Sequence, residues 1–575
     1  MSASDYSKRT VKAVKLILDK CSLSFGSGAC TATGTKCYNT KTTCKDVDNF
    51  NAENWEIFCI KDDSQIPSDV DAFPCLLSVT EPSTQIDERK GLAPVGTVTI
   101  TLSDFAVKHD DIDPYYKERE QHGHFFRRLQ AITKHFKNRL VKIKDGYILP
   151  DETRDFITTR EYIITSISGP TDNNVITLTA KEPFDRLKKQ IPATATAELS
   201  GAIDNSQLTF TVSGANLATE YKTILDVAPT ALLPIWLKID DEMLVCTDIT
   251  STTFTVTRGA LGTAAAAHDD ETLVAQVMVF DENCGDVWEE LLLYSGLDSG
   301  QIDTAGMAVQ QGLGLSDYDV YRVIVKQERV DVILQNLLEC CISFSWWDAE
   351  SQTTRIKIRR APLPTDIVTD IADNDLVAVR PTPRPQEKLR ITRCTIYTDV
   401  IDWSKGLTEK GNYYRPITFV NADYELDYEE VKERIIFAPW FGSDDYNLAL
   451  SVASSTVLRY GAAPVAMQLK IEDALAESVD VGDSVAVTCS SVENSDGTVP
   501  AVQGWVTGKK RMSGNQITHV YEWLSAGFAE RLWFYQPASA VGSTYSTATD
   551  EQKKYSYLAG TGGKMSDGTA GYSPQ

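Results

Sequence analysis

The feature that most constrains the fold is an alternation of apolar and polar side chains in short runs along the whole chain. It occurs in segments 98–102, 175–179, 235–239, 254–257, 354–358 and 519–523. Such a two-residue period is typical of strands that bury one face. Residues 505–512 and 516–523, joined by Ser513-Gly514-Asn515, predict a hairpin with a short loop. The sequence therefore predicts a mainly β protein made of several small sheets or barrels.

Three stretches predict short helices among the strands. In the first, over 125–140, apolar residues recur at steps of three and four on a basic background: Phe125, Leu129, Ile132, Phe136 and Leu140. The second covers 286–294. The third covers 330–340, where we expect one face to carry Val332, Leu334, Leu337 and Leu338.

The length and the charge of the chain narrow the class of protein. A chain of 575 residues is long enough for several domains. Its net charge of −24 argues against a protein that wraps nucleic acid, because phosphate contacts need Lys or Arg. The acidic residues are concentrated in one part of the chain: residues 201–300 contain three Lys or Arg against 16 Asp or Glu. No apolar run reaches the roughly 20 residues of a membrane span, and the N-terminus has no signal-peptide core, so we expect synthesis in the cytoplasm.

Shifts in composition predict a division into six regions. They are an N-terminal strand with a Cys-rich loop (1–90), a β domain with the basic helix (91–195), a small inserted acidic β module (196–276), a second domain (277–385), a third, barrel-like β domain (386–536) and an extended C-terminal arm (537–575).

Known catalytic motifs are missing from the sequence. It contains neither Gly-x-Ser-x-Gly nor His-Glu-x-x-His, and it has six histidines in all. We therefore expect a protein that is not an enzyme.

The cysteines are the strongest candidates for a binding site. Four of the twelve lie in a loop rich in Gly, Ser and Thr, with eight, six and six residues between them: Cys21, Cys30, Cys37 and Cys44. Such a loop cannot build its own apolar core. Four thiolates on it could bind an iron–sulfur cluster or zinc, and disulfides or free thiols remain alternatives. Cys246, Cys284, Cys340, Cys341, Cys394 and Cys489 are expected in the core.

Four stretches together resemble the tail hub proteins (baseplate hub or minor tail proteins) of long-tailed bacteriophages and gene transfer agents. The first is the cysteine loop. The second is Gly96-Thr-Val-Thr-Ile-Thr-Leu-Ser-Asp-Phe105 with the His109 to Tyr115 and Gly123 to Arg127 segments. The third is Ile239-Asp-Asp-Glu-Met-Leu244 with Val256 to Thr263 and His268, and the fourth is the run from Arg531 to Tyr572. They occur in the family's order over nearly the whole chain.

The resemblance implies a fold and a role. It implies β domains of tail-hub type that form a homotrimeric, non-catalytic ring in the virion. That ring joins the six-fold tail tube and distal tail protein to the central tip fibre, contacts the C-terminus of the tape measure protein, and surrounds a channel that DNA passes without specific binding. It also implies an iron–sulfur cluster of the 4Fe–4S type on Cys21, Cys30, Cys37 and Cys44, with Cys59 or Cys75 as substitutes.

An alternative function is recognition of a carbohydrate receptor at the tail tip. The acidic module around residues 201–275 would then grip sugar through Trp236 and its acidic edge. Against it, the apolar residues of this module alternate as those of a core do.

Overall fold

The computed structural model describes most of the chain. The described residues are 9–61, 72–106, 115, 117, 121–149, 153–194, 197–213, 234–250, 252–360, 366–377, 380–472, 479–494, 496–513, 517–525, 534–535 and 557–558. Strands account for 44% and helices for 20% of the structure. The fold is therefore mainly β, with several sheets and a few short helices, as the alternation predicts.

An eight-stranded sheet forms the N-terminal part, in the order β3-β2-β1-β7-β8-β9-β6-β4. Its strands are β1 (Arg9–Cys21), β2 (Ala52–Ile60), β3 (Ala72–Phe73), β4 (Leu76–Thr80), β6 (Thr97–Ser103), β7 (Leu140–Ile148), β8 (Arg154–Ser168) and β9 (Val175–Lys181). In β6 every second residue is buried, so the alternation of 98–102 does mark a strand with one face in the core.

The helix α1 (Phe125–Ile132) covers this sheet and buries Phe125, Phe126, Leu129 and Ile132. The prediction of a helix over 125–140 is wrong beyond Ile132. Thr133 adopts an extended backbone, which ends the helix, and Leu140 already begins β7. Phe136 is still buried, but from a loop, so the apolar period continues after the helix has stopped.

The small module is the outer part of a seven-stranded sheet in the order β11-β12-β15-β14-β13-β16-β17. Its strands are β11 (Glu198–Leu199), β12 (Thr209–Ser213), β13 (Ile235–Ile239), β14 (Glu242–Thr250), β15 (Thr253–Ala260), β16 (Val274–Asn283) and β17 (Asp319–Ile324). The inward residues of β13 and β15 form a separate core with Cys246. The long strand β16 connects this module to the rest of the chain.

A helical body follows β16. It contains α3 (Cys284–Ser295), α4 (Thr304–Gly312) and α5 (Val330–Cys340), the hairpin of β19 (Ser343–Asp348) and β20 (Thr353–Ile358), and the short pair β10 (Gln190–Ile191) and β18 (Glu328–Arg329). The predicted helices over 286–294 and 330–340 are confirmed. Leu334, Leu337 and Leu338 are buried, whereas Val332 is 54% exposed, so it does not share their face.

Two further sheets complete the structure. A three-stranded sheet in the order β24-β23-β25 packs on α7. The elements of this part are β23 (Arg393–Val400), β24 (Tyr413–Val420), α6 (Ala422–Tyr428), β25 (Glu433–Phe437) and α7 (Tyr446–Tyr460). The last sheet contains β21 (Ile367–Ala372), β22 (Arg384–Pro385), β26 (Val465–Glu472), β27 (Ser484–Thr488), β28 (Ala501–Ser513) and β29 (Ile517–Ser525), and β5 (Thr84–Gln85) pairs with β28.

The predicted hairpin is confirmed, because β28 and β29 pair antiparallel up to Ser513 and Ile517. The proline-rich segment near 380–385 supplies only β22, a two-residue edge strand, where a missing N–H is tolerated.

The remaining elements are short. Single 3-10 turns span Val47–Asn49, Pro183–Lys188, Ser299–Gln301, Leu315–Asp317, Asp373–Asp375, Glu387–Leu389 and Lys410–Asn412. The strands β30 (Phe534–Tyr535) and β31 (Tyr557–Leu558) pair with each other, and the rest of the predicted arm, 537–575, lies outside the described residues. Among the described helices, none has the length and apolar character needed to cross a membrane.

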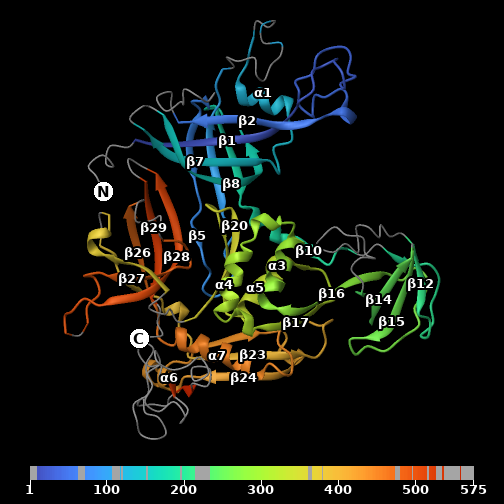
Figure 1. The fold of residues 1–575 in the computed structure, drawn as a ribbon, viewed down its shortest axis with the longest axis vertical. Coiled ribbons are helices and arrows are strands. Elements are labelled where there is room, and N and C mark those ends of the chain that lie inside the picture. Colours follow the sequence, from blue (N-terminus) through green and yellow to red (C-terminus); the bar gives the residue numbers. More distant parts are fainter. Residues whose placement is uncertain are drawn as a thin grey trace.

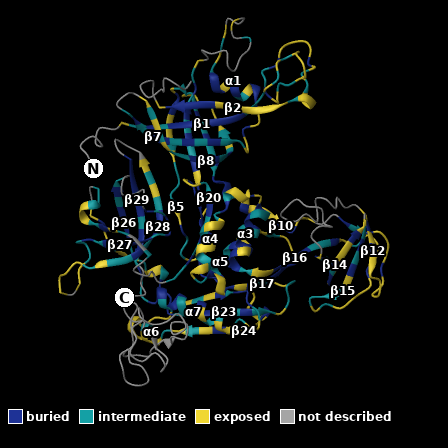
Figure 2. Cartoon of the chain, viewed as in Figure 1, coloured by how far each residue is buried: buried dark blue, intermediate teal, exposed yellow. Residues whose placement is uncertain are grey.

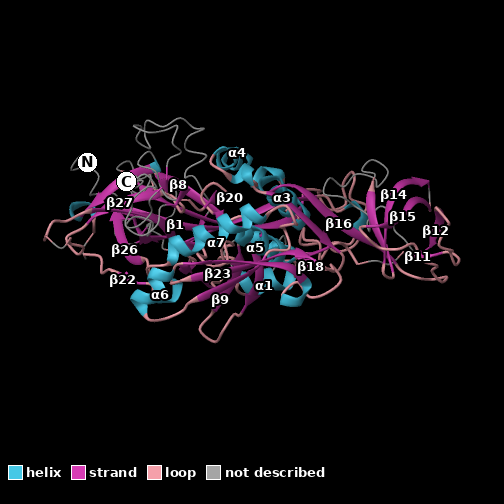
Figure 3. Cartoon of the chain, turned by 90° about the horizontal axis from the view of Figure 1, so that it is seen from below, coloured by secondary structure: helices cyan, strands magenta, loops and turns pink. Residues whose placement is uncertain are grey.

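Figure 1 shows how the parts are arranged: the eight-stranded sheet with α1 lies at one end of the long axis, and the sheet on α7 lies at the other. The helical body lies between them, and the small module projects to the side. Figure 3 shows the same module at one end of a flat, elongated molecule. In Figure 2 the buried residues follow the strands of the sheets and the inner helices. The predicted domain limits stay predictions.

Candidate functional site

The cysteine loop leaves the end of β1 and returns at β2. Cys21 is the last residue of β1, and its N–H donates to the carbonyl of Asn39 at 2.7 Å. The Cys37 thiol lies 3.6 Å from the side-chain oxygen of Asn39. Cys37 is buried, whereas Cys21, Cys30 and Cys44 are partly exposed.

These four thiols do not form a metal-binding set in this geometry. Nowhere in the described part of the chain do three or more His, Cys, Asp or Glu side chains group so that they could hold a metal ion. We assign no chemistry to an iron–sulfur cluster or zinc at these residues. The cluster stays a prediction from the sequence.

The two substitutes, Cys59 and Cys75, lie elsewhere. Both are buried in the core of the eight-stranded sheet. Their side chains are hydrogen-bonded to each other; this bond and burial raise the pKa of the Cys59 thiol well above its usual value. The structure thus brings these two cysteines together in the core, away from the loop that holds the other four. The six cysteines expected in the core are buried as well.

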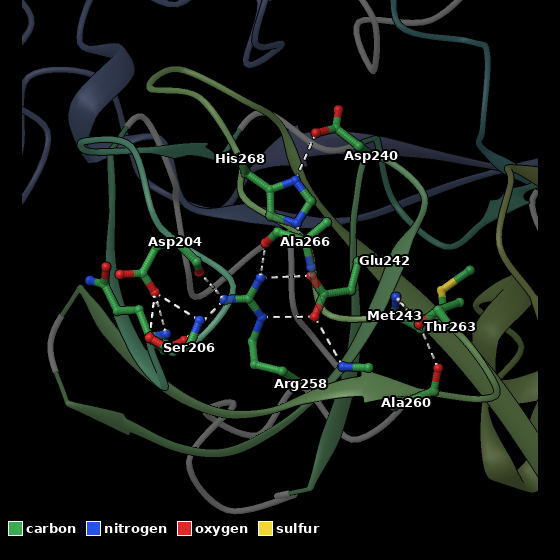
Figure 4. Close-up of polar contacts among 12 residues, drawn as sticks. Asp204, Ser206, Asp240, Glu242, Met243, Arg258, Ala260, Thr263, Ala266 and His268 are labelled. Atoms are coloured by element: carbon green, nitrogen blue, oxygen red, sulfur yellow. Dashed lines mark hydrogen bonds and ion pairs between the residues drawn. The ribbon is translucent and has the colours of Figure 1, made fainter.

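The small module contains a buried polar network, shown in Figure 4. Asp240 and Asp241 form the tight turn between β13 and β14, since Ile239 pairs directly with Glu242. Glu242 follows this turn and is 2% exposed. The Arg258 guanidinium binds its carboxylate through two nitrogens, each 2.7 Å from an oxygen.

Three further donors complete the coordination of Glu242. The N–H groups of Gly259 and Ala266 each lie 3.0 Å from a carboxylate oxygen, and so does Nε2 of His268. The other ring nitrogen of His268 lies 2.8 Å from Asp240. Burial would raise the pKa of Glu242, but the hydrogen bonds from Arg258, Ala266, His268 and Gly259 outweigh it and lower this pKa to about 2.

Arg258 also hydrogen-bonds to a loop that is distant in the sequence. Its Nη1 donates to the carbonyls of Asp204, at 2.9 Å, and Gln207, at 3.0 Å. Because every oxygen of Glu242 is occupied and shielded from water, the group is not available as a catalytic base. The arrangement instead fixes three loops at one end of the module.

Trp236, the residue named for carbohydrate binding, lies at the inner side of the small module. It is half-buried and packs against the small apolar cluster that contains Met243 and Val277. The residue named for the alternative function therefore belongs largely to the packing between β13, β14 and β16.

A second site is the connector, which we define as residues 81–96. At its start, Glu81 accepts from Arg160 of β8 at 2.5 Å. The connector then adds β5 to the edge of β28, and the N–H of Ile86 donates to the carbonyl of Thr507 at 2.7 Å. It therefore bonds to both large sheets.

The same connector bonds to the helical body and to α7. The carbonyl of Glu88 accepts from Arg359 at 3.3 Å, and its carboxylate accepts from the Tyr460 hydroxyl of α7. The N–H of Ala93 donates to the carbonyl of Ser345 in β19 at 2.9 Å. Sixteen consecutive residues thus contact four parts of the fold.

Two glycines make this path possible. Gly91 has a φ of +73°, and a Cβ there would lie 2.5 Å from the carbonyl oxygen of Ser343. A Cβ on Gly96 would meet the Glu182 carboxylate, which accepts the Gly96 N–H at 2.7 Å. A side chain at Gly91 would push the connector away from β19, and one at Gly96 would displace the Glu182 carboxylate from its hydrogen bond.

A cavity of about 40 Å³ lies where the connector crosses the two large sheets. Its charged lining residues come from six segments and are Glu81, Arg160, Glu182, Asp348, Glu350, Asp480, Lys509 and Arg511. Burial raises the pKa of Glu182 to about 7, because one N–H donor from Gly96 compensates only part of the desolvation. We call this cavity and its charged lining residues the junction; it is a network of charges between the two large sheets.

Neither site follows from the sequence as a site. The residues of the polar network were singled out as motifs, but nothing in them indicated their mutual contacts. One sequence feature could have indicated the connector: the Gly91-Leu-Ala-Pro-Val-Gly96 stretch, whose two glycines flank an apolar run.

No model of a protein family matches the sequence, and no curated protein does. Among solved structures, the chain is similar to a 43 kDa tail protein of prophage MuSo2 from Shewanella oneidensis, with 9% identity and a TM-score of 0.36 over 78% of this chain and 97% of that one. It is similar to a tail protein from Neisseria meningitidis MC58, with 9% identity and a TM-score of 0.33 over 78% and 93%. A chain of a native gene transfer agent virion gives 7% identity and a TM-score of 0.27 over 65% and 83%. At such low identities and TM-scores these likenesses carry no argument for the fold, family or function of this chain.

Proposed function

We propose that the chain is a structural, non-catalytic component of a bacteriophage tail tip or baseplate. In this proposal three copies form a hub ring in the virion. The ring joins the tail tube and the distal tail protein to the central tip fibre, contacts the C-terminus of the tape measure protein, and surrounds the channel through which DNA leaves.

The observation that carries the proposal is the connector. A hub must transmit force between neighbours of different symmetry, so its domains must not move freely. Residues 81–96 hydrogen-bond to both large sheets, the helical body and α7, which makes one mechanical unit of parts far apart in the sequence. The motifs that resemble tail hub proteins support the same role.

The experiment is a measurement of mass and shape. Multi-angle light scattering of the purified full chain should give three times its 63.6 kDa mass, and electron microscopy should show a three-fold ring with a central channel. A protein that stays monomeric or dimeric across the accessible concentration range contradicts the hub.

A further inference from the structure

Five exposed lysines lie together beside α1. They come from the cysteine loop and from the segment that follows α1, and we call them the lysine surface: Lys36, Lys41, Lys45, Lys134 and Lys137. They stand out in a chain whose net charge is −24.

Hydrogen bonds hold the two segments against each other. The Thr40 hydroxyl donates to the carbonyl of Ile132 at the end of α1, and the N–H of Lys134 donates to the Thr42 hydroxyl at 3.2 Å. The Lys45 ammonium lies 2.5 Å from the Thr35 hydroxyl, close to Lys36. In Figure 1 the loop, in dark blue, lies next to α1. The lysines therefore form one surface, although the segments are about 90 residues apart in the sequence.

The positive charge of this surface is not neutralised within the described chain. None of the ion pairs seen among the described residues uses one of the five lysines. Two carboxylates lie on the same loop: Asp46 accepts from Thr31 at 2.7 Å and Asp48 is exposed. Within the described residues of these two segments, five cations against two anions leave an excess that favours an acidic partner.

The chain itself carries a surface of matching chemistry. The exposed carboxylates of the small module are Asp204, Asp240, Asp241, Asp248, Asp269, Asp270 and Glu271. In its described residues, 197–213, 234–250 and 252–276, the cations are Lys238 and Arg258, and Arg258 is buried on Glu242. The polar network holds the loops of Asp204, Asp240 and Asp269–Glu271 at one end of the module, as Figure 4 shows for the first two.

We propose that the lysine surface docks on the acidic end of the small module of a second copy of this chain. Figure 1 shows the cysteine loop and the module on separate parts of one molecule, so the contact is between copies. It is a head-to-tail contact between two different patches, the kind that closes into a ring when the rotation allows. The inference rests on the proposed ring and names the surfaces that form it.

Charge reversal tests the contact. The triple variant K36E/K41E/K134E and the acid-side variant D241K/D269K/E271K should each weaken self-association of the full chain at least about tenfold in sedimentation velocity at about 50 mM salt. The variant that carries all six substitutions should restore self-association, because the charges of the two surfaces are exchanged. The matched control K388E/K405E/K510E changes the net charge equally and should leave association unchanged. Circular dichroism confirms that each variant is folded.

Three results would overturn the inference. The first is a wild-type trimer that persists in both triple variants, which leaves the hub proposal intact. The second is loss of association in the matched control as well, or no recovery in the variant that carries all six substitutions. The third is binding of a short DNA duplex that K36E/K41E/K134E abolishes without changing self-association, which would make the lysines a nucleic-acid site. A wild-type chain that never associates contradicts the hub and the inference together.

Discussion

The polar network of the small module and the central junction each bury a glutamate, but they surround it differently. Glu242 receives five donor groups, two of them from one guanidinium, and its pKa falls to about 2. Glu182 receives the Gly96 N–H, and its pKa rises to about 7. The same side chain at similar burial is thus held as an anion in one region and close to neutral in the other. Two causes act together: desolvation is the largest cause of the raised pKa of Glu182, and Glu242 receives more donors, each of which offsets part of the desolvation of its charge.

The largest expected effect comes from removing the cation of the network. Arg258→Leu leaves Glu242 buried without its main partner, so the local free energy of unfolding of the module should fall by about 3–5 kcal/mol. Hydrogen exchange of the amides in 235–275 measures it. Lys238→Leu, on β13 of the same sheet, is the control and should change the value by less than about 0.5 kcal/mol. Unchanged exchange in Arg258→Leu would mean that the network does not stabilise the module.

The stability that Glu182 contributes at the junction should fall as the pH rises, which is opposite to the pH dependence expected for Glu242. The folded pKa of Glu182, about 7, lies above the usual 4.5, so its contribution to stability is complete below pH 4.5 and is lost as the pH rises to 7. At pH 8 Glu182→Gln should therefore be more stable than the wild type by about 3 kcal/mol, and near pH 4 the two should be equal. Denaturant titrations at several pH values measure the difference.

Glu242→Gln is the opposing arm of this experiment. The pKa of Glu242 is lowered, so its contribution is present above pH 4.5 and is lost as the pH falls towards 2. This variant should be less stable than the wild type at pH 7, and the deficit should shrink in acid. If the stability of both variants relative to the wild type changed with pH in the same direction, the two glutamates would not differ in the way proposed.

The smallest of the three effects separates backbone strain from steric conflict in the connector. Gly91→Ala combines a positive φ with a Cβ only 2.5 Å from the Ser343 carbonyl, and it should cost about 2 kcal/mol in global stability. Gly201→Ala in the small module has a φ of +106° but open space around its Cβ, so it should cost about 1 kcal/mol. Thermal unfolding compares them. Equal losses would show that the connector tolerates the extra carbon.

Local patterns predicted the elements better than their limits. The strands at 98–102 and 235–239 appear where the alternation places them, since a half-buried strand needs that alternation wherever it lies. The helix at 125–140 was predicted too long, because the buried Phe136 continues the apolar spacing from a loop that also faces the core. Val332 has the right residue type for the core but is exposed, because it lies off the face of α5 that buries Val330, Ile333 and Leu337.

The sequence by itself determined the mainly β character, the excess of acidic residues in the small module and the positions of the strands that alternate most regularly, because these depend on side-chain period and composition. Tertiary structure alone decided which distant groups meet. Arg258 reaches Glu242, and residues 81–96 bond to four parts of the fold, through backbone paths that local periodicity does not encode. The lysines of the loop became one surface only when Thr40 and Thr42 met the end of α1. Contacts of this kind are set by how sheets pack, and so they appear only in the folded chain.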